Sequence, residues 1–390
     1  MVGHRRSRFE SLEKRLALAV TAAVDNGSLV IKGDADGAVQ IVAVSAGNYE
    51  VHDNGVLIAD STTLTGITKN IKINIDASAG ADNTVTLDLG GQTVNQVSAN
   101  LGNGANSLTV SDGTAASLVY TGGSGNDTVE LDSSVTGKAD VKLGNGDNSL
   151  TVNGALGSLA VRGGSGADTI TLASVASITN GVSACLGNGN NSLTLNGSVG
   201  GSLQVAAGDG ADTVTLADTS AITKNASIDL GGGTNTATIG GSLRYNGRDG
   251  DDTVTIEQTA TITDDVFAAL GNGVNVFLHN GTINGDLKAV SKNADDSITV
   301  GDTGTVAGTT TLGPGQQTDH DHGGCGGGHG GGDDNRGAGS LAGGHSCAGD
   351  TGSTGTGGKT TTTTSTTSTA KKSAASITSR VAALAQALRR

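Results

Sequence analysis

Four aspartates recur at matching places in glycine-rich stretches and are the residues of this chain best suited to bind a metal ion. They occupy the sixth position of GGSGNDTVE, GGSGADTIT, AGDGADTVT and GRDGDDTVT, and they are Asp127, Asp168, Asp212 and Asp252. Carboxylates and the carbonyls of a glycine-rich turn are the hard oxygen ligands that calcium prefers. Aspartate also tolerates tight turns. The stretches therefore predict either calcium loops or simple turns between strands.

A second motif alternates with the first and carries asparagine at the same position. Copies of LGNGxNSLT begin at Leu101, Leu143 and Leu186, and weaker copies begin at Leu230 and Leu270. The sixth positions of both motifs follow one another at intervals of about 21 residues. If such units stack about 4.8 Å apart, each aspartate lies over an asparagine rather than over another charge, and the two can hydrogen-bond. The alternation thus also predicts a purely structural polar ladder.

Each unit of about 21 residues predicts three short strands. In the stretch DTITL, Ile170 and Leu172 point to one side of a strand and the threonines beside them to the other. Two further apolar segments follow at residues 176–178 and 182–186. Such short strands bury a common face only when units stack on one another. The expected fold is therefore all-β: a parallel β-helix, or solenoid, which we take as right-handed from the usual preference of parallel connections.

The loop GGSGADTIT matches the pattern G-G-x-G-x-D-x-U-x and resembles the RTX, or hemolysin-type, calcium-binding repeat family. The matching residues are Gly163, Gly164, Gly166, Asp168 and Ile170. The resemblance implies that calcium is a cofactor and that the four aspartates named above are its carboxylate ligands. The chain departs from the family in two respects: about 12 residues separate each loop from the next, and the loop stacked on each aspartate carries asparagine.

The composition favours narrow stacked coils over a conventional globular core. The chain has 390 residues, of which 65 are glycine, only three are Phe and three Tyr, and none is Trp. Its formal net charge is −14. Because binding to phosphates requires clustered Lys and Arg, we expect no nucleic-acid partner.

Serine and threonine fill the predicted outward positions beside the loops, as in Ser149 and Thr151. Such rows resemble the surface of ice-binding proteins, although threonine is favoured on exposed strands in any case. A carbohydrate-acting β-helix enzyme, a lyase or a hydrolase, is the main alternative and requires carboxylate pairs or a Lys/Arg cluster in a groove. We expect no outward column that gathers Arg and Lys, and His52 and His279 lie in no nucleophile motif. We therefore predict a structural or adhesive protein without enzyme activity.

The N-terminal residues 1–24 predict an export leader. A basic start precedes an apolar run over residues 16–23, with a cleavage point near Ala22 or Ala23, although an ordinary amphipathic helix is an alternative. The string FESLEKRLALA resembles the LEPR-XLL leader of large bacterial surface proteins. We expect a secreted or cell-surface protein whose partners are the extracellular matrix, the cell envelope or another surface protein. Residues 25–75 are expected to form capping strands, and residues 76–316 the repeats.

The C-terminal part changes composition abruptly and predicts a disordered linker over residues 317–371. This part contains soft or borderline metal ligands that suit a transition metal, although their spacing matches no zinc-finger pattern. These ligands are His320, His322, Cys325, His329, His345 and Cys347. In an exported protein, Cys325 and Cys347 could instead form a disulfide, which would leave Cys185 as a buried odd cysteine. Residues 372–390 predict a short amphipathic helix, the one segment expected to contact a membrane.

Overall fold

The computed structural model describes residues 20–33, 38–58, 63–75, 81–217, 220–239 and 243–314. The chain divides into two units after Ala348, and all of these residues belong to the first. Leader residues 1–19, the predicted linker 317–371 and the predicted helix 372–390 lie outside the described residues. Within the described ranges, no helix is long and apolar enough to cross a membrane.

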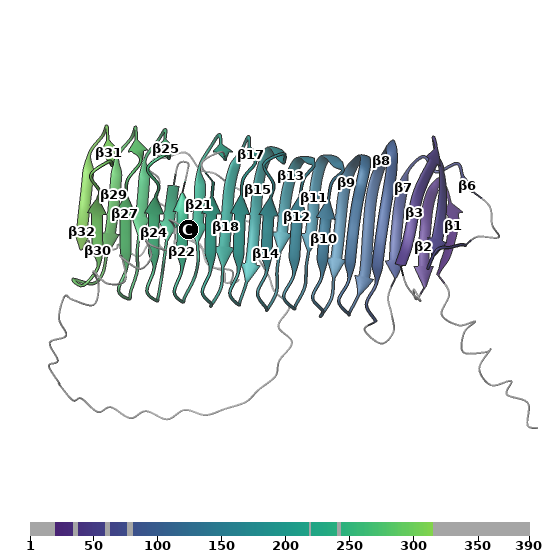
Figure 1. Ribbon diagram of the computed structural model, residues 1–390, viewed down its shortest axis with the longest axis horizontal. Helices are drawn as coiled ribbons and strands as arrows, with labels where there is room; N and C mark the ends of the chain where they lie inside the picture. Colours follow the sequence, from purple (N-terminus) through teal and green to yellow (C-terminus); the bar gives the residue numbers. More distant parts are fainter. Residues whose placement is uncertain are drawn as a thin grey trace, which may run out of the picture. The chain divides into compact units, whose positions relative to one another are not determined.

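The described residues form a parallel β-solenoid in which each coil contributes strands to three columns (Figure 1). We name the columns A, B and C. Column A contains the first parts of β8 (Thr84–Gly102) and β9 (Ser107–Gly122), then β10 (Thr128–Leu131), β12 (Ser149–Val152), β14 (Thr169–Leu172), β16 (Ser192–Leu195), β19 (Thr213–Leu216), β22 (Thr236–Ile239), β24 (Thr253–Ile256), β27 (Val276–His279) and β30 (Ser297–Val300).

Column B follows the turn at the far side of each coil. It contains β7 (Asn70–Ile75), the last parts of β8, β9, β11 (Ser134–Lys142), β13 (Ala155–Arg162) and β15 (Ser177–Gly187), then β18 (Ser202–Ala207), β21 (Ala226–Asp229), β23 (Leu243–Asn246), β26 (Val266–Ala269), β29 (Leu287–Ser291) and β32 (Thr310–Pro314). Column C is short and contains the middle parts of β8 and β9, the starts of β11, β13 and β15, then β17 (Ser198–Val199), β20 (Ala221–Ile222), β25 (Thr261–Ile262), β28 (Thr282–Ile283) and β31 (Thr305–Val306).

Successive coils pair in register, so that equivalent residues of the repeat lie directly over one another. Thr169 pairs with Ser149 of one neighbouring coil and with Ser192 of the other. The sequence prediction of a parallel β-solenoid with a repeat of about 21 residues is therefore confirmed.

The core is the narrow interior between the three columns. In β14, Ile170 and Leu172 are fully buried, whereas Thr169 is exposed, as the period of two predicts. Valine, isoleucine and leucine fill most inward positions, and Tyr120, Tyr245 and Phe277 are among the largest buried side chains. Each such aliphatic side chain contributes about 1.5–3 kcal/mol by leaving water, so the stack of apolar rows supplies the main driving force for coiling.

Antiparallel strands are found at the N-terminal end of the solenoid. β1 (Thr21–Asp25) pairs with β2 (Ser28–Gly33), and β3 (Ala38–Ser45) pairs with β4 (Asn48–Asp53). β4 also pairs with β5 (Val56–Leu57) and with β6 (Leu64–Thr65). β2 and β3 pair in parallel with β7 and β8 and so extend columns B and A. The predicted cleavage points at Ala22 and Ala23 lie within β1, so cleavage there would remove part of this strand.

The close approach of stacked loops makes a clear prediction for glycine. A Cβ at Gly189, whose φ is +114°, would overlap the carbonyl oxygen of Gly166 in the preceding coil. A Cβ at Gly55, whose φ is +78°, would have no atom within 4 Å. Gly55→Ala should therefore cost only the backbone strain of about 1–2 kcal/mol, and Gly189→Ala should cost about 3 kcal/mol or more. Urea unfolding of the full chain measures both, and equal losses would contradict the close packing of the loops.

Candidate functional site

The four aspartates predicted to bind calcium lie at the ends of the loops that lead into column A. Asp127, Asp168, Asp212 and Asp252 are at most 1% exposed. The structure brings them into a single line with the asparagines of the second motif. The members of this line, which we call the polar ladder, are Asn83, Asn106, Asp127, Asn148, Asp168, Asn191, Asp212, Asn235, Asp252, Asn275 and Asp296.

One hydrogen bond repeats at every step of the polar ladder. The backbone N–H of each member donates to the Oδ1 atom of the member in the next coil, for example from Asn148 to Asp168 at 3.1 Å and from Asp168 to Asn191 at 3.0 Å. The ten bonds from Asn83 to Asp296 range from 2.7 to 3.1 Å. The predicted structural ladder is confirmed.

The asparagines use their second side-chain atom to hold the loop. Nδ2 of Asn148 donates to the carbonyl oxygens of Gly144 and Gly146, at 3.3 and 2.9 Å, and to Oδ1 of Asp168 at 2.8 Å. Asn191 repeats this pattern in its own coil. An aspartate at these positions would lack the N–H donor, which explains why the LGNGxN loops carry asparagine.

The aspartates leave their second oxygen without a hydrogen bond. Oδ2 is buried and unpaired in Asp127, Asp168, Asp212 and Asp252. In the Asp168 coil, this oxygen and the carbonyl oxygen of Leu186 both lie where a Cβ on Gly163 would stand. The absence of a side chain at Gly163 therefore makes room for the carboxyl group, and it brings the carboxyl close to a backbone acceptor of the next coil.

Asn83 shows which kind of group suits the position that the aspartate Oδ2 atoms occupy. Its Nδ2 donates to the carbonyl oxygen of Leu101 at 3.0 Å, and Leu101 occupies the same position in its coil as Leu186 does over Asp168. The site thus suits a donor, and a carboxyl group becomes a donor only when it holds a proton. Burial in the apolar interior raises the pKa of Asp127, Asp168 and Asp212, and raises that of Asp252 to about 7. Desolvation is the largest effect on these pKa values and favours the neutral form, whereas the backbone N–H groups of Gly123 and Gly164 favour the charged forms of Asp127 and Asp168.

Two tyrosines lie beside the ladder in the core. The buried hydroxyls of Tyr120 and Tyr245 form no hydrogen bond of normal geometry, yet they lie near enough to Asp127 and Asp252 to favour the charged forms of those carboxyls. Burial, and secondarily the neighbouring aspartate, raises the pKa of each tyrosine. In both aspartates, desolvation is the larger effect on the pKa and favours the neutral form.

The ladder aspartates fit a calcium site poorly. Calcium requires six to eight oxygen ligands, whereas the polar ladder offers one carboxylate in every second coil, whose Oδ1 already accepts a backbone N–H, and an asparagine in the coil between. No group of three or more His, Cys, Asp or Glu side chains in the described ranges is placed to hold a metal. The calcium assignment remains a prediction. The tail ligands His320, His322, Cys325, His329, His345 and Cys347 lie outside the described residues.

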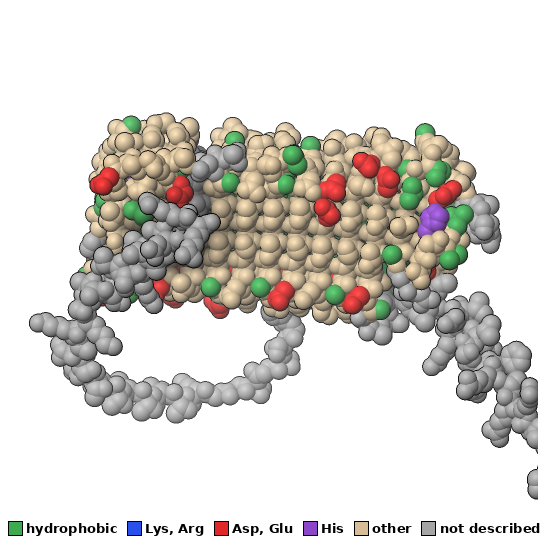
Figure 2. Space-filling model, viewed as in Figure 1, with side chains coloured by type: hydrophobic (Ala, Val, Ile, Leu, Met, Phe, Trp, Pro, Cys, Tyr) green, Lys and Arg blue, Asp and Glu red, His purple; other side chains and the backbone are tan. Residues whose placement is uncertain are grey.

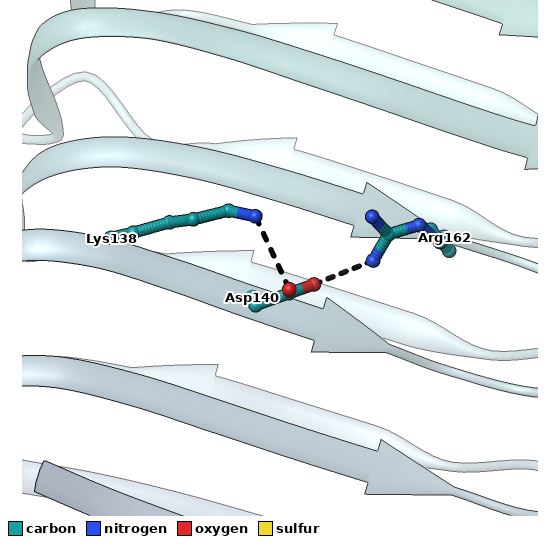
Figure 3. Close-up of polar contacts among 3 residues, drawn as sticks. All are labelled: Lys138, Asp140 and Arg162. Atoms are coloured by element: carbon teal, nitrogen blue, oxygen red, sulfur yellow. Dashed lines mark hydrogen bonds and ion pairs between the residues drawn. The ribbon is translucent and has the colours of Figure 1, made fainter. Parts of the chain in front are cut away.

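A shallow groove of about 380 Å³ runs along the outer surface of column B. Its lining includes Lys138, Arg162 and Lys224 and small residues between them. Asp140 joins two of these cations, accepting from Arg162 Nη1 at 2.7 Å and from Lys138 Nζ at 3.2 Å (Figure 3). The expectation that no outward column gathers Arg and Lys is therefore wrong. The three cations occupy different positions in their repeat units, so a search for periodic charges does not find them.

Cys185 lies in the same groove. It is half-buried on the outer side of β15, because its neighbours Ala184 and Leu186 occupy the inward positions, and it forms a disulfide. The prediction of a buried odd cysteine is therefore wrong. The other two cysteines of the chain, Cys325 and Cys347, lie outside the described residues.

The outer surface of column A carries two rows of hydroxyl side chains, which we call the hydroxyl face. In-register pairing aligns these residues across successive coils as the sequence predicted. One row contains Thr84, Ser107, Thr128, Ser149, Thr169, Ser192, Thr213, Thr236 and Thr253, and the other contains Thr86, Thr109, Thr151, Thr171, Thr194, Thr215 and Thr255. Regular tan rows, the colour of the backbone and of side chains that are neither charged nor hydrophobic, cover much of the surface seen in Figure 2. Glu130 interrupts one row, and Val276 and Leu278 end both.

The raised pKa values of the ladder aspartates predict that the protein becomes less stable as pH rises from about 5 to about 8. Because their pKa is raised above the 3.8 of the unfolded chain, the folded chain holds protons that the unfolded chain releases. This stabilisation is complete below the unfolded pKa and is lost as pH passes through the folded pKa, which is about 7 for Asp252. Thermal unfolding of the full chain across this range measures it. A midpoint that stays constant or rises with pH would contradict neutral aspartates.

Substitution of Asp252 tests whether its carboxyl group is stabilised by a bound proton or by a calcium ion. Asp252→Asn should raise the unfolding midpoint at about pH 8 and flatten its pH dependence, because an amide donates without titrating. Asp252→Ala should lower stability by about 1–3 kcal/mol, because the N–H of Asn235 loses its acceptor. Both are measured in EDTA and in millimolar calcium. If calcium raises the midpoint of the wild-type chain and Asp252→Asn abolishes this rise, the result would contradict a protonated Asp252 and support calcium binding.

No family model, curated protein or solved structure matches this chain.

Proposed function

We propose that this protein is an exported structural and adhesive scaffold that binds a repetitive polymer of the extracellular matrix or cell envelope through its hydroxyl face. The observation that carries this proposal is the alignment of threonine and serine along the strands and across the coils, which Glu130 breaks at one position. Hydroxyls both donate and accept hydrogen bonds, as the hydroxyls of a polysaccharide do. The face therefore offers complementary groups at a constant repeat.

The rigidity of the face supports binding to a repeating partner. Coils lie about 4.8 Å apart, and threonine, being β-branched, has few rotamers to lose on contact. Each hydrogen bond is weak by itself, but contacts that form together on one rigid surface raise the overall affinity without any single strong site. An extended partner with a regular surface would gain most from this arrangement.

The groove on column B gives less support to the alternative of a carbohydrate-cleaving enzyme. Glycoside hydrolysis needs two carboxyl groups, one of which must carry a proton, and no Asp or Glu is among the residues that line this groove. The nearest acid in the ion-pair cluster, Asp140, has both oxygens engaged by Lys138 and Arg162. This cluster stabilises charge on the surface and leaves no free acid or base.

The disulfide at Cys185 supports the exported location. Disulfides persist in secreted and surface proteins and are rare in the reducing cytosol. The N-terminal leader inferred from the sequence points in the same direction, and a scaffold that binds matrix or envelope polymers must reach them outside the cell.

Two lysines on the hydroxyl face should abolish adhesion. The double variant Thr151→Lys, Thr194→Lys places long cations two coils apart and prevents flush contact, whereas the control Thr136→Lys alters an exposed position outside column A. The assay measures depletion of the full chain from solution by insoluble cellulose, chitin and peptidoglycan. We expect at least one polymer to retain the protein and the control, and the double variant to bind about tenfold less. Stabilities should agree within about 0.5 kcal/mol.

Failure to bind any of these polymers would contradict the adhesive proposal. Equal loss in the control would show that added charge, rather than the hydroxyl face, governs retention. Inhibition of ice growth by the wild-type chain, lost in the double variant and without retention on polysaccharide, would assign the same face to ice.

A further inference from the structure

We propose that the outer face of column B binds an acidic polysaccharide, a sugar polymer that carries carboxylates, through Arg244, Phe267 and Lys288. We call these three residues the cationic patch. The proposal rests on the distribution of Lys and Arg over the solenoid, on the contacts of Phe267 and on the register of the strands. It goes beyond the adhesive function proposed above, because it concerns another surface and another class of polymer and does not depend on the hydroxyl face.

Column B gathers the cations of the solenoid. Every Lys and Arg within the described ranges lies on a strand of this column or of its extension β2, or within two residues of the end of such a strand. These residues are Lys32, Lys69, Lys72, Lys138, Lys142, Arg162, Lys224, Arg244, Arg248, Lys288 and Lys292. The chain as a whole has a net charge of −14. Its described positive charges are therefore concentrated on one surface, and an anionic partner is steered toward that surface.

Phe267 fixes the positions of two of these cations. Cζ of Arg244 lies 5.1 Å and Nζ of Lys288 lies 5.7 Å from the centre of its ring, within the distance of about 6 Å at which a cation is attracted to an aromatic face. The register pairs Phe267 with Arg244 on one side and with Lys288 on the other, so the ring lies between the two cations. The strands that carry them are two coils, about 10 Å, apart.

The two cations are accessible to an external anion. Arg244 and Lys288 are exposed and Phe267 is half-buried. None of the ion pairs within the described ranges includes either cation. Two acids, Asp265 and Asp286, precede the patch in its strands, and Oδ1 of each accepts a backbone N–H of the following coil, at 2.8 and 2.7 Å. The aromatic ring therefore holds the cations without neutralising them.

The row of side chains that contains the patch also provides hydrogen-bonding groups. Gln204, Ser227 and Thr311 occupy the equivalent position in other coils. Amide and hydroxyl groups both donate to and accept from sugar hydroxyls, and the Arg244 guanidinium is able to donate two parallel hydrogen bonds to one carboxylate. Because the row runs along the axis of the solenoid, its charges and hydrogen-bonding groups are aligned for an extended polymer of acidic sugars.

Two other anionic polymers fit this surface less well. Single-stranded nucleic acids bind through bases that stack on open aromatic faces. Of the Phe and Tyr side chains within the described ranges, only that of Phe267 reaches the surface, and cations flank its ring. An acidic peptide is flexible and loses more conformational freedom on binding than a stiff sugar chain does. The surface therefore favours the polysaccharide.

The disulfide at Cys185 lies away from the patch. Cys185 is aligned, one coil at a time, with Ala206, Asp229, Asn246 and Ala269. Ala269 belongs to the same strand as Phe267, so four steps of about 4.8 Å place the ring about 19 Å from Cys185 along the axis. The patch is therefore separate from the groove that contains the disulfide.

Titration calorimetry of the full chain with polygalacturonate, a polymer of uronic acid, tests the proposal in about 20 mM sodium chloride, where exposed charges are weakly screened. We expect the wild-type chain to bind. The double variant Arg244→Gln, Lys288→Gln should bind about tenfold more weakly, because it loses two charge-assisted contacts. Both side chains are exposed, so the unfolding midpoint should not change.

The matched control Lys32→Gln, Lys69→Gln removes the same charge from exposed positions at the N-terminal end of column B. It should change the affinity by less than about twofold, because it lies many coils from the patch. Absence of binding by the wild-type chain would overturn the proposal. An equal loss in the two double variants would show that net charge, rather than the patch, governs binding, and would overturn it as well.

The variant Phe267→Leu tests whether the ring positions the two cations. Leucine keeps an apolar side chain and both charges but offers no aromatic face to a cation. The affinity for polygalacturonate should fall about threefold, as expected from the loss of an exposed cation–π contact. An unchanged affinity would show that the cations act independently of Phe267 and would overturn the patch as a preorganised site.

Other polymers test the chemical class of the ligand. Neutral dextran should not bind, and about 200 mM sodium chloride should weaken the binding of polygalacturonate several-fold. If poly-L-glutamate or single-stranded DNA binds as tightly as polygalacturonate, charge alone governs binding and the assignment to a polysaccharide is overturned. Binding that does not change with salt would overturn the role of the cations.

The hydroxyl-face variant Thr151→Lys, Thr194→Lys separates this proposal from the adhesive function. Its changes lie on column A, so it should bind polygalacturonate at least as tightly as the wild-type chain does, even where it no longer binds insoluble polymers. Loss of polygalacturonate binding in this variant would assign the acidic polymer to the hydroxyl face and would overturn the cationic patch.

Discussion

The solenoid depends on one hydrogen bond that is repeated at every coil, from the backbone N–H of a ladder residue to the side-chain oxygen of the next. At each loop the chain turns into column A, and this N–H is buried there. A buried N–H without an acceptor costs about 1–3 kcal/mol. Because the acceptor belongs to the neighbouring coil, each coil completes the one before it. The bond also fixes the register, since a slip of one residue would remove the acceptor from every loop.

The alternation of Asp and Asn is coupled to a second alternation at the start of each loop. Loops that end in Asn begin with a buried leucine, as at Leu143 and Leu186, whereas the Asp168 loop begins with Gly163. The leucine fills the core and presents its carbonyl to the carboxyl group of the coil before it, and the glycine leaves the space that this carboxyl occupies. The backbone thus repeats every coil and the side-chain chemistry every two. The pairing places a carboxyl group beside a carbonyl without stacking one ladder carboxyl directly on another.

The parts of this structure that follow from periodicity could be predicted from the sequence, and the parts that join unrelated positions could not. The repeat of about 21 residues predicts the columns, the inward Ile170 and Leu172, and the ladder, because in a stacked fold identical positions must meet. The direction of the Asp168 Oδ2 atom depends on Gly163 and on the next coil, neither of which the loop motif alone reveals. The groove is a different case. Asp140 forms ion pairs with Lys138 of its own strand and with Arg162 of the adjacent strand. These residues do not recur at equivalent positions of the repeat, so the periodic pattern does not predict their contact.

Charged side chains are distributed unequally between the two main surfaces of the solenoid. Column A presents hydroxyls and few charges, and the four ladder aspartates beneath its edge are favoured in their neutral form by burial. Alternation of Asp with Asn keeps ladder carboxyls two coils apart, and the in-register pairing of the same coils aligns the hydroxyl rows. Column B carries the cations and the disulfide. The hydroxyl rows and the cations thus lie on different surfaces of one repeat, and the polar ladder joins the coils that carry both.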